Sequence, residues 1–166
     1  MKGKYFCLIT AFVLLTLSGC GDSGVDVSEE QSSTASEKNE QTISEGEGLK
    51  IEISELSETV SFYPLVVDGT EMEVIACKDS DGNIRTAFNT CQVCYSLGKG
   101  YYVQEGDYLV CQNCGNSFTA DQIGEESGGC NPYPITDSDR AVSDETVTIF
   151  YSFLKEQAEI FSNWKA

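Results

Sequence analysis

Apolar and polar residues alternate along the first half of the segment 50–166, which is the pattern of strands with one buried face. The expected strands cover residues 59–67, 71–77, 84–88, 101–103 and 108–110. Turn-forming pairs separate several of them, at Asp68-Gly69, Asp81-Gly82 and Glu105-Gly106. Because these turns are short, we expect the neighbouring strands to pair as antiparallel hairpins.

The period of the apolar positions changes toward the C-terminus. After a short strand expected at 146–149, apolar side chains recur at steps of three and four residues from Phe150 to Phe161. This spacing predicts an amphipathic helix of about three turns, whose aromatic stripe packs on the sheet or meets a partner. The predicted fold class is therefore α+β, with mainly antiparallel β hairpins, a Cys-ligated ribbon and a C-terminal helix, in one domain over residues 50–166.

The first nineteen residues are typical of an export signal. Lys2 and Lys4 precede an apolar run, from Phe6 to Leu17, that is short for a membrane span. Small residues then lead to Cys20 in the order L-S-G-C, which is the pattern of a bacterial lipobox. We predict a lipoprotein signal peptide over 1–19 and lipidation at Cys20; an ordinary signal peptide or a short anchor helix is the alternative. A lipid on Cys20 would hold the protein on the extracytoplasmic face of a membrane in the bacterial cell envelope.

Residues 20–49 separate this signal from the domain. The segment has no aromatic residue and is rich in Asp, Glu, Ser and Gly, so we expect a disordered acidic tether. The whole chain carries a formal net charge of −17. Such a polyanion does not bind nucleic acid, and anionic lipid headgroups repel it, so contact with the membrane depends on the N-terminal lipid.

The candidate chemistry lies in closely spaced cysteines. Cys91, Cys94, Cys111 and Cys114 form the pattern C-x2-C-x16-C-x2-C, and the chain has no histidine. Each C-x2-C turn directs two sulfurs to one point, so two turns joined by a hairpin predict a tetrahedral metal site made of four thiolates. Such a site holds iron or zinc, and the same ligands hold an iron–sulfur cluster or Cu(I).

Two further cysteines leave alternatives open. Cys130 lies in G-G-C-N-P, where glycines allow a close approach to the site, and is a candidate fifth thiolate, a replacement ligand or a buried cysteine in a turn. Cys77 lies in an expected strand and fits the core as a small apolar residue. Six cysteines in the domain also allow a disulfide framework, and each C-x2-C allows a thiol redox pair.

The combined motifs resemble one family over most of residues 50–161. They are I-S-E-L-S-E-T-V-S-F-Y at 53–63, K-D-S-D-G-N-I-R-T-A-F-N-T-C-Q-V-C at 78–94, G-Y-Y at 100–102, V-C-Q-N-C-G at 110–115 and G-G-C-N-P-Y-P-I at 128–135. With them the domain resembles the FtrD-like membrane iron–sulfur proteins. The C-Q-N-C-G turn is similar to a rubredoxin or zinc-ribbon knuckle, and the paired ligand loops are similar to those of a Rieske domain, which uses two histidines.

The resemblance implies a role in ferrous iron uptake. We expect an extracytoplasmic, lipid-anchored protein that binds iron or an iron–sulfur cluster and passes electrons or metal to a partner of an envelope iron-transport or redox system. Zinc and Cu(I) are the alternative metals. A binding module stapled by zinc or disulfides, without a redox role, is the alternative function. Since the sequence offers no nucleophile–base pair and no nucleotide loop, a carrier is expected rather than an enzyme.

Overall fold

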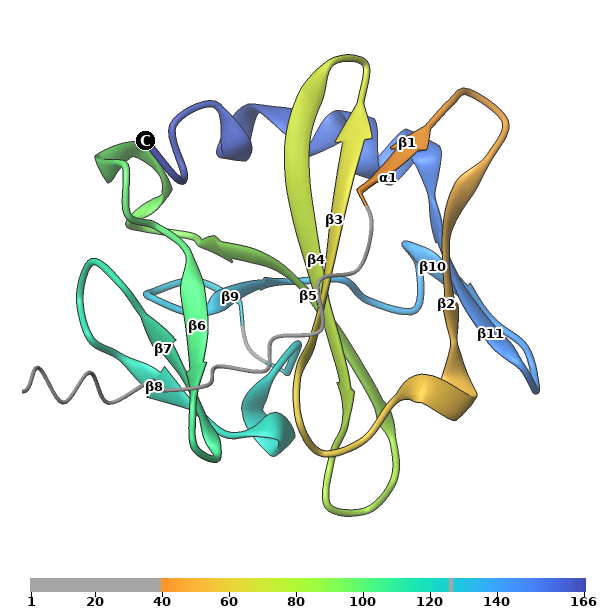
Figure 1. Cartoon of the computed structure of the whole chain (residues 1–166), viewed down its shortest axis with the longest axis horizontal. Coiled ribbons are helices and arrows are strands. Elements are labelled where there is room, and N and C mark those ends of the chain that lie inside the picture. The colour runs from red at the N-terminus through yellow and green to blue at the C-terminus, as the bar shows by residue number, and fades with distance from the viewer. Residues whose placement is uncertain (1–39, 126) are drawn as a thin grey trace, which may run out of the picture. The chain divides into compact units, whose positions relative to one another are not determined.

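The computed structural model describes residues 40–125 and 127–166. Within these residues the fold is mostly β, with strands in three sheets (Figure 1). The strands are β1 (Gln41–Ile43), β2 (Gly48–Glu52), β3 (Ser61–Val67), β4 (Thr70–Lys78), β5 (Ile84–Cys91), β6 (Tyr102–Glu105), β7 (Tyr108–Cys111), β8 (Ser117–Phe118), β9 (Pro132–Pro134), β10 (Arg140–Val142) and β11 (Thr146–Phe150). The helical segments are α1 (Tyr151–Glu156) and the 3-10 turns η1 (Ile53–Glu55), η2 (Tyr95–Leu97), η3 (Ala120–Gln122) and η4 (Ala158–Phe161).

The largest sheet has the strand order β1-β3-β4-β5-β9. Strands β3, β4 and β5 form consecutive antiparallel hairpins, while β1 pairs with β3 in parallel. The turn between β3 and β4 places Asp68 and Gly69 at φ of 49° and 83°, the left-handed conformation that a two-residue hairpin turn requires at both positions. The expected hairpins of this region are therefore confirmed.

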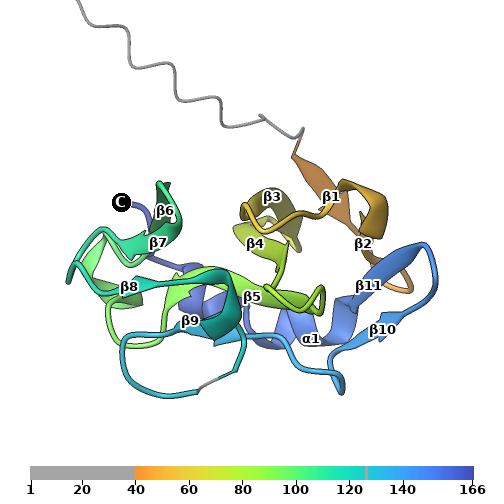
Figure 2. The same cartoon turned by 90° about the horizontal axis from the view of Figure 1, so that it is seen from below.

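Two three-stranded sheets flank the large sheet, as Figures 1 and 2 both show. One has the order β10-β11-β2 and the other β6-β7-β8, and all their pairs are antiparallel. Residues 92–101, which include η2, connect β5 to the sheet β6-β7-β8. The two C-x2-C turns lie side by side, since Asn113 of the second donates a hydrogen bond to Sγ of Cys94 in the first.

The two faces of the large sheet are covered by two separate clusters of buried side chains. We call the first the apolar core: it joins β2, β3, β4, β5, β11 and α1, and includes Leu49, Leu65, Val74, Phe88, Ile149 and Leu154. We call the second the cysteine core, formed by Val60, Ile75, Cys77, Ala87, Cys91, Cys94, Tyr102, Leu109, Cys111 and Ile123. Successive residues of β4 alternate between the two, because neighbouring side chains of a strand point to opposite faces.

The prediction of an α+β fold with a C-terminal helix is wrong. The α-helix α1 has six residues, and after Gln157 the chain continues as the 3-10 turn η4. The aromatic stripe explains the break. Phe153 and Phe161 both pack on Phe88, with ring centroids 5.5 Å and 5.4 Å away. A continuous α-helix would separate residues eight positions apart by about 12 Å along its axis, so the break after Gln157 brings the two rings closer to their shared contact.

The folded part of the chain begins before Lys50. Strand β1 and the first residues of β2 lie in the stretch 20–49, where Ile43 and Leu49 are buried in the apolar core. The proposed signal peptide (1–19), Cys20 and most of the proposed tether lie outside the described residues. In the part of the chain that is described, no helix has the length and apolarity needed to cross a membrane.

Candidate metal centre

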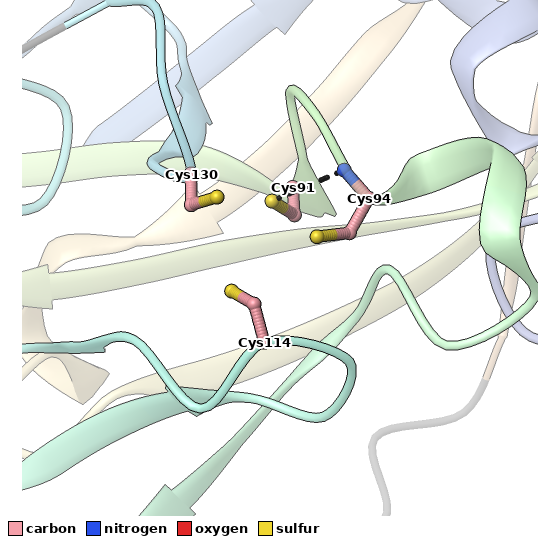
Figure 3. Close-up of side chains that lie close together, drawn as sticks. All are labelled: Cys91, Cys94, Cys114 and Cys130. Atoms are coloured by element: carbon pink, nitrogen blue, oxygen red, sulfur yellow. Dashed lines mark hydrogen bonds between the residues drawn. The ribbon is translucent and has the colours of Figure 1, made fainter.

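Four cysteine side chains converge at the end of the cysteine core. The sulfur atoms of Cys91, Cys94, Cys114 and Cys130 all lie within 4.8 Å of one another. Figure 3 shows the four side chains directed toward a common point from three separate stretches of backbone. We call this group the four-thiol site. It is the arrangement expected of ligands around a bound metal ion.

The first turn of the site follows the last residue of β5. The backbone N–H of Cys94 donates to Sγ of Cys91 over 3.4 Å, and the N–H of Cys91 donates to the carbonyl oxygen of Gly100 over 2.6 Å. Gly100 packs tightly on this turn: a Cβ there would lie 2.5 Å from Cα of Tyr95 and 2.6 Å from the carbonyl oxygen of Cys94. A residue without a side chain is therefore needed where the chain returns toward β6.

The second turn contributes one cysteine to the site. Cys111 is the last residue of β7, and its side chain lies in the cysteine core together with that of Leu109, two positions earlier on the same strand face. Cys114 follows in the turn and is exposed. Gly115, at φ of 75°, donates its N–H to the carbonyl oxygen of Cys111 over 2.9 Å, which closes the turn. Cys111 is not one of the four thiols that converge, but its thiol bonds to that of Cys114 and so lies directly beside the site.

Cys130 reaches the site from the loop before β9. The Tyr102 hydroxyl donates to the carbonyl oxygen of Cys130 over 2.8 Å. Gln92, in the first turn, accepts from the N–H of Gly128 through Oε1 over 2.7 Å and donates its own N–H to the carbonyl oxygen of Asn131 over 3.2 Å. The loop is thus bonded to the first turn on both sides of Cys130.

A buried amide positions Tyr102. Oδ1 of Asn89, on β5, accepts the Tyr102 backbone N–H over 2.8 Å, and its Nδ2 donates to the Tyr102 carbonyl over 3.2 Å. The same Nδ2 also donates to a carboxylate oxygen of Glu73. These bonds hold the start of β6 against β5. They thereby place the Tyr102 hydroxyl within hydrogen-bond distance of Cys130.

Hydrogen bonds also reach the sulfur atoms themselves. Nδ2 of Asn113, in the second turn, donates to Sγ of Cys94 over 3.2 Å. This contact crosses from one C-x2-C turn to the other. Since a hydrogen bond to sulfur stabilises negative charge on it, Asn113 favours the thiolate form of Cys94.

The thiols of the site ionise unequally. Burial opposes ionisation of Cys91, but hydrogen bonds from Tyr102 and from backbone N–H groups lower the pKa of its thiol. Burial also opposes ionisation of Cys114, and backbone and thiol hydrogen bonds lower its pKa below the usual value. Burial raises the pKa of Cys94 and raises that of Cys130 to about 12. Complete ionisation of the site therefore requires a bound cation to offset the repulsion between thiolates.

The donor set suits a thiophilic metal. Four sulfurs with two N–H···S bonds, in a chain without histidine, match the thiolate ligation of iron, alone or in a cluster, and of zinc. The family comparison points the same way, because the family described as "Membrane iron-sulfur containing protein FtrD-like" matches residues 56–161. The chain belongs to the FtrD-like family. No curated protein matches it.

The FtrD-like domain brings together three of the four cysteines that the spacing indicated, Cys91, Cys94 and Cys114, and adds Cys130. Cys111 and Cys77 are free thiols in the cysteine core, where burial raises the pKa of each to about 12. All six cysteines in the described part of the domain are free.

Sequence reasoning missed the residues that support the site of this FtrD-like protein, which are Asn89, Gln92, Tyr102 and Asn113. Asn113 lies between Cys111 and Cys114, and a side-chain amide inside a C-x2-C turn is a signal that could have identified it as a donor to sulfur. Tyr102 gave no such signal, since its role depends on a loop 28 residues further along the chain.

Proposed function

We propose that this protein is an extracytoplasmic, lipid-anchored iron carrier that passes electrons to an envelope partner within an iron-uptake system. The convergence of four thiols within 4.8 Å of one another is the observation that carries the proposal. Membership of the FtrD-like family supports iron as the metal. The lipobox-like residues that end at Cys20 support the anchor. Bound iron would supply one-electron chemistry.

The surface beside the site supports contact with a partner. Cys114 is an exposed member of the site. Val93, between the first two cysteines, has 54% of its surface exposed, and Leu97 in η2 has 62%. Apolar side chains around an accessible ligand allow a partner to approach closely while excluding water. The formal charge of −17 favours a partner with a positive surface through faster association.

A structural role for the metal is the second candidate. Cys91 and Cys94 are buried members of the cysteine core, as the ligands of a folding-linked zinc site would be. A structural zinc site has no accessible redox state. The two functions therefore differ in whether the metal exchanges electrons while the fold persists.

The test uses the full chain, purified without oxygen from bacterial membranes. Metal analysis and a potentiometric titration followed by visible absorption should show bound iron that takes up and releases an electron reversibly. Zinc at full occupancy, with no redox transition, would support the structural role instead. For the anchor, Cys20→Ser should abolish incorporation of labelled lipid; unchanged labelling would refute it.

A further inference from the structure

The spacing of the four sulfurs distinguishes between the forms in which iron can bind. Around a single tetrahedral ion with bonds of ~2.3 Å, the four sulfur atoms stand about 3.8 Å apart. The upper limit of 4.8 Å for all pairs in the four-thiol site is consistent with this distance, allowing a small contraction on binding. All four sulfur atoms can therefore bind one metal ion placed between them.

A cluster needs a wider set of ligands. In a four-iron cluster each cysteine binds a different iron, so the iron–iron separation adds to the sulfur–sulfur distance and brings it above about 6 Å. In a two-iron cluster the cysteines bind in pairs, and pairs on different irons stand more than about 5 Å apart. Both distances exceed the 4.8 Å limit.

The backbone around the site opposes the expansion that a cluster would require. Movement of the Cys130 backbone away from the site would break the bonds that Tyr102 makes to its carbonyl and that Gln92 makes to the residues near it on both sides. The first turn is equally constrained by the tight packing of Gly100 on the backbone of Cys94. Expansion of the site would therefore have to break hydrogen bonds or close packing in two of the three backbone stretches that supply the ligands.

We propose that the four-thiol site binds one iron ion through Cys91, Cys94, Cys114 and Cys130, and not an iron–sulfur cluster. Cys111 stays in the cysteine core as a non-ligand. The inference rests on the proposed function only in taking iron as the metal. The proposed cofactor, one iron ion, differs from the iron–sulfur cofactor that the family's description names.

Reconstitution of the full-length apoprotein without oxygen tests the proposal. One arm receives ferrous iron alone, and the other receives ferrous iron with sulfide. Both should bind one iron per chain, contain no acid-labile sulfide after desalting, and give after oxidation the paramagnetic resonance spectrum of a mononuclear high-spin ferric ion. Two or more irons per chain with matching sulfide would overturn the single-ion site but leave the carrier function standing. If neither arm bound iron, the single-ion site and the proposed iron-carrier function would both be overturned.

A matched pair of variants tests the ligand assignment. Cys111→Ala should keep the stoichiometry and the spectrum of the wild type, whereas Cys130→Ala should lower iron affinity at least tenfold and change the spectrum. Lower iron affinity in Cys111→Ala together with unchanged binding in Cys130→Ala would overturn the assignment. Cobalt titration of the wild type provides a measurement that does not depend on variants folding: it should saturate at one Co²⁺ per chain with tetrahedral absorption bands. Saturation at a higher ratio would contradict a single-ion site.

Discussion

The apolar core and the cysteine core lie on opposite faces of the same sheet but differ in chemistry. The apolar core consists of aliphatic and aromatic side chains from two of the sheets and from the C-terminal segment. Four of the ten buried members of the cysteine core are cysteines, and two of these belong to the four-thiol site. Burial of hydrocarbon stabilises the first core by itself, whereas a metal bound at the four-thiol site would add to the stability of the second. The comparison leads us to expect that removal of a bound metal would weaken the cysteine core more than the apolar core.

The largest expected effect comes from removing a side chain of the apolar core. Phe88 is fully buried and its ring contacts those of Tyr133, Phe153 and Phe161. Phe88→Ala should lower the free energy of unfolding by about 3–5 kcal/mol, equally with and without metal. Urea denaturation measures this. Phe150→Ala is the control, because that side chain is 39% exposed. A loss that depended on metal would show that the cores are not independent.

Removal of the metal should act on the other core. We expect amide hydrogens of β6, β7 and β8 to exchange at least tenfold faster in the apoprotein, a local cost of at least about 1.4 kcal/mol. Protection in β3, β4 and β11 should change little. Hydrogen exchange followed by mass spectrometry compares the two states. Equal loss of protection in all sheets would mean that the metal stabilises the whole domain.

A smaller effect is expected from acid at the β4–β5 turn. Hydrogen bonds from Asn83, aided by Arg85, lower the pKa of Asp79 to about 2. An unfolded chain protonates this carboxyl near pH ~3.9, so the bonds stabilise the fold above that pH and lose their effect as pH falls toward 2. Asp79→Asn should lower Tm at pH 7, with the difference from wild type shrinking below pH 4.

The neighbouring acid provides the matched control for that measurement. Asp81 belongs to the same turn, but its side chain is exposed. Asp81→Asn should leave Tm close to the wild-type value across the same pH range. If both variants behaved alike in thermal scans, the stabilisation would come from general charge and not from the bonds of Asp79.

The smallest effect is expected on the electronic properties of the site. The hydrogen bond from Asn113 to Sγ of Cys94 favours the reduced state of the site, which carries more electron density on sulfur. Asn113→Leu removes this bond. The reduction potential should fall by tens of millivolts, since a hydrogen bond of ~1 kcal/mol corresponds to about 40 mV for one electron. Asn116→Leu, in the same exposed turn, should leave the potential unchanged. A potential that rose in Asn113→Leu would contradict this role.

Local patterns in the sequence predicted the central strands well. Alternating residues and turn pairs located β3 to β7 and β11, because these strands have regular faces and short connections. Strands β1, β9 and β10 have three residues each, too few for alternation to be visible. The C-terminal helix was wrong because packing on Phe88, distant in sequence, interrupts a pattern that is locally helical.

The site could be predicted only in part for a related reason. Spacing identified two C-x2-C turns, but it treats both cysteines of a turn alike. The register of β7 directs Cys111 to the core with Leu109, and alternation along Tyr108-Leu109-Val110-Cys111 contained that information. The position of Cys130 depends instead on bonds from Tyr102 and Gln92, which no local pattern contains.

The close packing of Gly100 has a consequence for comparing family members. Backbone atoms of Cys94 and Tyr95 occupy the space that any other residue's Cβ would need. A homologue with a side chain at the equivalent position must arrange its first pair of cysteines differently, even if all of its cysteines align. This single position can therefore sort natural sequences into those able to adopt the present ligand geometry and those that have diverged to another one.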